Sequence, residues 1–152
     1  MNDDECCAVL KQFLRYDTSY PYPERDACVE WLRGQAISLG LQSEIVFCVP
    51  GVPILIMSRH SDDPTLPSIV LNCHIDVVPA EASQWSLLPA GQTPFSAYED
   101  GDGRIFGRGI QDMKSVGVQY LVAMSRLRHR RIGADGAHCV DAGRGTRRGM
   151  LA

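Results

Sequence analysis

The sequence lacks an apolar run long enough to cross a membrane. Its longest apolar stretch, residues 46–57, is interrupted by Pro50, Gly51 and Pro53, whereas a spanning helix needs about 20 consecutive apolar residues. It also lacks a basic N-terminus, because residues 2–5 read Asn-Asp-Asp-Glu where a secretory signal carries positive charge. We therefore expect a soluble, cytoplasmic protein.

The sequence also lacks a Cys-x-x-Cys pair, and its six cysteines have no regular spacing. This pattern does not indicate a structural zinc cage or a disulfide framework. In a reducing compartment the simpler interpretation is that the cysteines are small buried apolar residues. Cys73 precedes His74, but alternation along a strand would point the two side chains to opposite faces. We therefore expect Cys73 to lie in the core.

Acidic residues become scarce towards the C-terminus, and glutamate is absent after Glu99. The net charge of -3 combines -7 over residues 1–126 with +4 over residues 127–152, which hold six Arg and two Asp. Residues 130–152 contain five Gly and five Arg, and such a composition buries too little apolar surface to offset the entropy of ordering. We predict a domain over residues 1–129 and a disordered Arg/Gly-rich tail over residues 130–152.

Hydrophobic periodicity predicts an α/β layered domain. The patterns indicate helices at residues 3–15, 24–39 and 114–129, and strands at residues 43–49, 52–58, 68–72 and 105–106, with a long loop over residues 80–103. The continuous apolar runs 54–57 and 69–71 are typical of strands covered on both faces, which favours a mostly parallel sheet. Asp3 or Asp4 is expected to cap the first helix, and Gly40 to end the second.

The last predicted helix has a clear apolar stripe. Val116, Tyr120, Ala123, Met124 and Leu127 recur at helical spacing, so we expect them to face the core. Lys114, in the first turn, is expected to be a solvated charge.

His74, Asp76 and Asp112 are the candidate metal-site residues. His74 follows an apolar strand, at the end of a strand where α/β sheets build their sites, and Asp76 would share its face and orient the imidazole. Asp112 follows Gly107 and Gly109 and is placed to act as the N-cap of a helix. Imidazole and carboxylate are good zinc ligands, although an isolated His-x-Asp is common and Asp112 as a plain helix cap remains the alternative.

Two motifs carry a resemblance to a known family. Asn72-Cys73-His74-Ile75-Asp76-Val77-Val78-Pro79 is followed by Trp85, by Pro94-Phe95 and by Gly107-Arg108-Gly109-Ile110-Gln111-Asp112-Met113-Lys114. In this order the motifs resemble the dinuclear-zinc metallopeptidase and amidohydrolase family, and within it the aminoacylase-1-like members. The resemblance covers residues 8–128. It implies the N-terminal part of a zinc-exopeptidase-like catalytic domain.

The resemblance also implies roles for the candidate residues. His74 would ligate one Zn²⁺, Asp112 would bridge the two Zn²⁺ of a complete site, and Asp76 would be the catalytic-site carboxylate that positions His74. The implied reaction is hydrolysis of N-acyl-L-amino acids to an L-amino acid and a carboxylate by a zinc-activated water. The implied partner is a small N-acyl amino acid or dipeptide, with no nucleic acid and no membrane, and full-length relatives are expected to be homodimers.

The sequence departs from this family after Asp112. The family next supplies a Glu-Glu pair, whose first member is the general base, then further ligands and an inserted lid and dimerisation domain; none of these is present, and neither His138 nor Asp141 is expected to replace them. We therefore expect a truncated or out-of-frame product that is inactive by itself. The alternatives are a related dipeptidase or deacetylase, or a non-catalytic binding protein with a basic tail.

Overall fold

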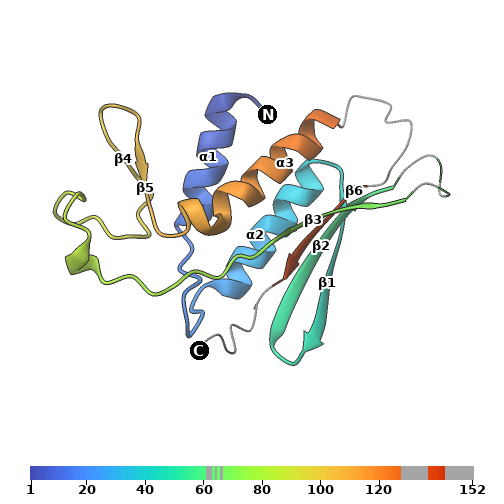
Figure 1. Cartoon of the computed structure of the whole chain (residues 1–152), viewed down its shortest axis with the longest axis horizontal. Helices are drawn as coiled ribbons and strands as arrows, with labels where there is room; N and C mark the ends of the chain where they lie inside the picture. The colour runs from blue at the N-terminus through green and yellow to red at the C-terminus, as the bar shows by residue number, and fades with distance from the viewer. Residues whose placement is uncertain (61–62, 64, 66, 128–136, 143–152) are drawn as a thin grey trace, which may run out of the picture.

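The computed structural model describes the chain except for residues 61–62, 64, 66, 128–136 and 143–152 (Figure 1). Its helices are α1 (Asp3–Leu14), α2 (Arg25–Ser38) and α3 (Ser115–Leu127), with a 3₁₀ turn at Ala82–Gln84 and a π-helical turn at Ile110–Lys114. Its strands are β1 (Gln42–Val49), β2 (Val52–Arg59), β3 (Ile69–Cys73), β4 (Tyr98–Glu99), β5 (Ile105–Phe106) and β6 (Ala137–Ala142). The predicted helices and the four predicted strands are confirmed to within a few residues.

The ends of α1 and α2 follow from local hydrogen bonding. Asn2, and not Asp3 or Asp4, caps α1: its side chain accepts a bond from Glu5 N, and the Glu5 side chain accepts one from Asn2 N, both at 2.9 Å. This reciprocal pair satisfies two helix-end donors at once, which explains why the cap lies one residue earlier than predicted. Gly40 follows α2 with φ +69°, as its predicted capping role requires.

The main sheet is mixed, in the order β1-β2-β6-β3. β1 and β6 both run antiparallel to β2, and only β3 and β6 are parallel. The prediction of a mostly parallel sheet is therefore wrong for the strands that the structure describes. The apolar runs that suggested it include Ile69 and Val70 of β3, which are exposed by 51% and 62% instead of being covered on both faces.

Strand β6 corrects the prediction of a disordered tail at residues 137–142. Its backbone pairs with β2 from Ile54 to Arg59 and with β3 from Ile69 to Cys73. The composition of the segment did not predict this strand, because the pairing groups are backbone amides and carbonyls offered by two other strands. The remainder of the predicted tail, with the proposed role of its arginines in binding, lies outside the described residues.

The three helices gather on one side of the sheet, and the β4–β5 hairpin lies at the opposite end of the molecule from β1 and β2 (Figure 1). The core between the helices and the sheet includes Phe13, Leu32, Leu55 and Leu121. No helix in the described part of the chain is long and apolar enough to traverse a bilayer.

The buried face of α3 differs from the predicted stripe. Its buried residues are Gly117, Val118, Leu121, Met124 and Ser125, so only Met124 of the predicted stripe is fully buried and Ala123 is exposed. Small residues explain part of the difference: a Cβ at Gly117 would lie 3.3 Å from both Cys73 Sγ and the Phe13 ring. The helix therefore approaches its neighbours through a residue that carries no hydrophobic signal.

Candidate metal centre

The first half of the site, which we call the His74 segment (residues 73–77), continues β3 beyond its last residue. Cys73, Ile75 and Val77 are buried, with exposed fractions of 6%, 1% and 7%. The alternate side chains of His74 and Asp76 are partly exposed on the other side, at 31% and 33%. The alternation confirms that Cys73 belongs to the core, and it places His74 and Asp76 on one face as predicted.

The second half, which we call the Asp112 turn (residues 109–114), is irregular. Gly109 opens it with φ +93°, and the Lys114 amide closes it by donating to Gly109 O at 2.8 Å. Asp112 has φ -131° and ψ 93°, and α3 begins only at Ser115. The prediction that Asp112 is a helix N-cap is therefore wrong: the residue sits in an extended conformation inside the turn, and its side chain is 67% exposed.

The two halves meet at the imidazole of His74. Its Nε2 lies 2.9 Å from Asp112 Oδ1, and its Nδ1 lies 2.9 Å from the backbone O and 3.1 Å from Oδ1 of Asp76. Nδ1 faces two acceptors, an arrangement that favours the tautomer with the proton on Nδ1 and the Nε2 lone pair on the side of Asp112.

An open cleft of about 980 Å³ contains all three residues. Its wall also includes Tyr20, Tyr22, Trp85 and Arg108, which the sequence analysis did not assign to a site. Arg108 Cζ lies 5.4 Å from the centre of the Trp85 ring, which is close enough for a cation–π interaction. The two tyrosines follow α1 in a proline-rich connection whose pattern carries no signal for a site.

The donor chemistry of His74 and Asp112 fits zinc, which takes imidazole nitrogen and carboxylate oxygen at about 2.0–2.2 Å. The Asp76 contact to Nδ1 is the outer interaction that usually fixes the tautomer of a zinc-bound histidine. However, the described residues contain no group of three or more His, Cys, Asp or Glu that could hold a metal. His74 and Asp112 are two converging side chains with the chemistry of zinc ligands, one fewer than a catalytic zinc site usually takes from protein.

The burial of Lys114 is the largest difference between the structure and the prediction from the sequence. The lysine was expected to be solvated, but its side chain is fully buried, and Nζ donates to the backbone oxygens of Phe13 at 3.1 Å and Tyr16 at 2.8 Å. Burial lowers its pKa to about 8, against smaller opposing effects of Cys28, Asp17 and Glu24. The residues around Lys114 do not indicate that it is buried, because the two acceptors are backbone groups about 100 residues away.

Comparison with known proteins gives this geometry a context. Residues 70–138, which include the His74 segment and the Asp112 turn, match peptidase family M20/M25/M40. Aminoacylase-1 of Sus scrofa is 42% identical over 120 residues, which is 79% of this chain and 28% of that protein. The family match covers 69 of the 152 residues, and the chain spans little more than a quarter of that relative.

Two solved structures share the fold of this chain. The M20 family metallo-carboxypeptidase Sso-CP2 of Sulfolobus solfataricus superposes on 94% of this chain with a TM-score of 0.78 at 22% identity. Human carnosine dipeptidase 1 covers 92% of the chain with a TM-score of 0.72 at 22% identity. In each case the chain spans about a third of the other protein, 31% and 32%. The likeness to these structures shows the α/β fold of this chain and no more.

Proposed function

We propose that the cleft is the metal-binding part of an aminoacylase-type amide hydrolase. The observation that carries the proposal is the convergence of His74 Nε2 and Asp112 Oδ1 at 2.9 Å, with Asp76 held against the other ring nitrogen. The sequence relationship to aminoacylase-1, at 42% identity, supports the choice of substrate class. The chain spans 28% of that relative, so the activity of a whole aminoacylase is part of the proposal.

The roles of the three residues follow from their contacts. His74 and Asp112 would hold the metal, and the Asp112 carboxylate would be shared with a second ion. Asp76 would keep the His74 ring in the tautomer that presents Nε2 as a ligand. Zinc, when bound, supplies Lewis-acid polarisation of an amide carbonyl and activation of water.

The remainder of the cleft suits a small N-acylated amino acid. Val78, Ile105 and Phe106 give the wall apolar surface, and Arg108 gives it a positive charge. An amide substrate has apolar groups on both sides of the scissile bond and a carboxylate at one end, so a mixed wall of this kind matches its chemistry.

General-base catalysis needs a further group. No glutamate follows Asp112 in the sequence, and Asp76 is occupied by its contact with the His74 ring. A base must lie within hydrogen-bond reach of the proton that it removes. We therefore propose that the 152 residues bind zinc but do not turn over substrate alone.

Zinc titration of the purified chain tests the metal site. We expect calorimetry to show a zinc-binding component that is lost in His74→Ala and retained in His60→Ala, because His60 is an exposed histidine that contacts Gln42. The paired histidine variants separate this site from adventitious binding by exposed thiols such as Cys7 and Cys48. Equal zinc binding in His74→Ala and the unaltered chain would refute the metal site.

An amidase assay tests the second half of the proposal. The zinc-loaded chain should release no methionine from N-acetyl-methionine above the rate of the His74→Ala variant. Turnover that a chelator abolishes would show that a base is present and would contradict the predicted inactivity.

A further inference from the structure

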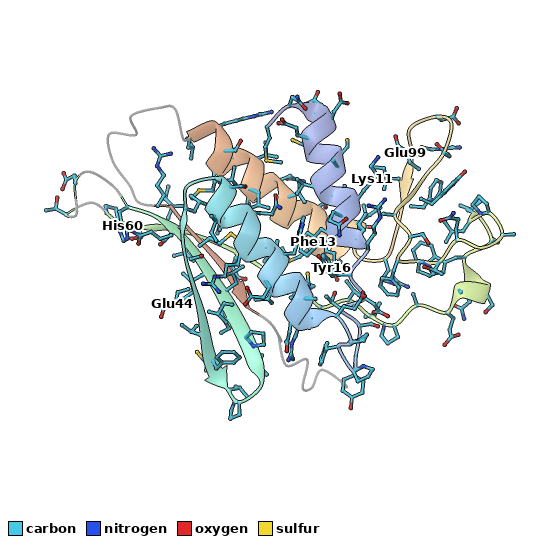
Figure 2. The ribbon with its side chains drawn as sticks, turned by 180° about the vertical axis from the view of Figure 1, so that it is seen from behind. Lys11, Phe13, Tyr16, Glu44, His60 and Glu99 are labelled. Atoms are coloured by element: carbon cyan, nitrogen blue, oxygen red, sulfur yellow. The ribbon has the colours of Figure 1, made fainter. Side chains whose placement is uncertain are left out.

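The segment of residues 13–19, which we call the α1 exit, lies against both halves of the candidate metal centre. It comprises the last turn of α1 and the chain that follows, and Figure 2 shows Phe13 and Tyr16 near the middle of the molecule at the end of that helix. Its contacts with the two halves are made by different groups. Together these contacts relate the His74 segment to the Asp112 turn.

The contact with the Asp112 turn is made by Lys114. Its ammonium donates to Phe13 O and Tyr16 O and lies 5.1 Å from the centre of the Phe13 ring. The last carbonyls of a helix have no partner within the helix and carry its negative partial charge. The buried ammonium of Lys114 therefore donates hydrogen bonds to backbone oxygens that would otherwise have no donor in the apolar core.

The contact with the His74 segment is made by Thr18 and Ser19. The hydroxyl of Thr18, which is fully buried, donates to Ile75 O at 2.6 Å, and Val77 N lies 3.4 Å from Thr18 O. Ser19 and Val77 form a parallel β-bridge. The α1 exit thus holds the backbone on both sides of Asp76, next to His74.

The two halves also touch directly at Gly109. A Cβ at this position would lie 2.7 Å from Val77 Cγ1 and 3.3 Å from Lys114 Cδ. The aliphatic stem of Lys114 therefore packs beside the contact between the Asp112 turn and the His74 segment. A shift of the Lys114 side chain would therefore change the distance between the His74 segment and the Asp112 turn.

The Asp112 side chain is 67% exposed, so packing contributes little to its position besides its contact with His74 Nε2. The backbone of the turn carries this carboxylate, and Lys114 closes that backbone through its amide and anchors it through its ammonium. Metal ligands must lie within about 0.2 Å of their working distances. Lys114 lies two residues from Asp112 and restrains the backbone of the turn, so it can hold the Asp112 carboxylate within this tolerance.

We propose that Lys114 is a positioning residue for the candidate metal centre. Its buried ammonium ties the Asp112 turn to the α1 exit, which also holds the His74 segment, and so sets the separation of His74 Nε2 and Asp112 Oδ1. The inference rests on the proposed function. It goes beyond that function by giving a role to a residue that touches neither substrate nor metal.

The test compares the two lysines of the chain, Lys114 and Lys11. Methionine keeps most of the aliphatic stem and removes the ammonium, so Lys114→Met breaks the tie with little change in volume. Lys11→Met is the matched control, because Lys11 is partly exposed and is paired with Glu99 at 2.6 Å (Figure 2), and neither residue lines the cleft. Zinc binding is taken as the calorimetric component that His74→Ala removes.

We expect Lys114→Met to lower zinc affinity about 10-fold, the lower end of the effect of losing a group bonded to a metal ligand, while near-UV circular dichroism shows the folded state. Lys11→Met should leave the affinity unchanged. A folded Lys114→Met variant with unchanged affinity, or an equal loss in Lys11→Met, would overturn the inference and leave the proposed function standing. Absence of any His74-dependent zinc binding in the unaltered chain would overturn both.

A second measurement decides the matter if Lys114→Met does not fold. The unaltered chain is labelled with ¹³C-lysine and gives two side-chain resonances. The resonance that is missing from the Lys11→Met variant belongs to Lys11, and the other belongs to Lys114. Saturating zinc should then shift the Lys114 resonance and leave that of Lys11 in place. A Lys114 resonance that does not respond to zinc overturns the inference.

Discussion

The His74 segment and the Asp112 turn bring one ligand each to the same point, but they are built in different ways. The His74 segment continues a strand, and its alternate residues are buried and exposed in regular order. The Asp112 turn has no regular repeat: a glycine opens it and a buried lysine closes it. Both rest on the α1 exit, one through a neutral hydroxyl and the other through an ammonium.

The difference shows how local and distant interactions share the work of building a site. Strand alternation alone sends His74 and Asp76 to one face, because successive side chains of a strand point to opposite sides. The residues around Asp112 shape the turn but do not by themselves place its carboxylate, since the turn is anchored at Phe13 O and Tyr16 O. The Asp112 turn should therefore be the more sensitive half.

Gly109→Ala should give the largest fall in the free energy of unfolding, because it changes the residue at which the Asp112 turn contacts the His74 segment. Alanine would be strained at φ +93°, and its Cβ would overlap Val77 Cγ1. Strain and overpacking together should lower the free energy of unfolding by about 2–5 kcal/mol, measured by urea denaturation. The control is Gly103→Ala, where φ is +78° but no atom lies within 4 Å. Equal losses in the two variants would show that the contact with Val77 contributes nothing.

The pH dependence of the free energy of unfolding should reveal the buried ammonium of Lys114, which anchors the Asp112 turn but not the His74 segment. The pKa of Lys114 falls from 10.5 to about 8 on folding, so the unfolded chain binds more protons between these values. The free energy of unfolding should therefore rise by up to about 3 kcal/mol as the pH goes from 8 to 10.5. Urea denaturation with a chelator present measures this rise as the difference between the unaltered chain and Lys114→Met. A constant difference over this pH range would contradict the prediction.

Thr18→Val should give the smallest of the three effects, because it removes a neutral contact from the His74 segment. Valine has nearly the shape of threonine but leaves Ile75 O without the hydroxyl donor. We expect a loss of about 1–2 kcal/mol in the free energy of unfolding and a smaller fall in zinc affinity than in Lys114→Met. Thr65→Val is the control, since Thr65 is exposed and bonds only to nearby Asp63 among its described contacts. A larger effect on zinc affinity than that of Lys114→Met would reverse the ranking of the two halves.

The same division between local and distant interactions decides which parts of the structure could be predicted from the sequence. The helices, the β1–β2 pair and the end of β3 before His74 depend on periodicity and turn residues, so their predicted positions agree with the structure. The buried face of α3 does not, because Gly117 makes the close approach and Lys114 enters the core ahead of it. β6 was also missed, since its order comes from backbone pairing with β2 and β3.

By itself the sequence determined the α/β class, the core position of Cys73 and the three residues of the candidate site. These depend on residue type and spacing along a short stretch of chain. Only the tertiary structure decided that the sheet is mixed, that Asp112 lies in an extended turn, and that Lys114 is buried against the α1 exit. The physical reason is that backbone carbonyls distant in the chain supply the hydrogen bonds that a buried charge needs, and a sequence pattern contains no record of such acceptors.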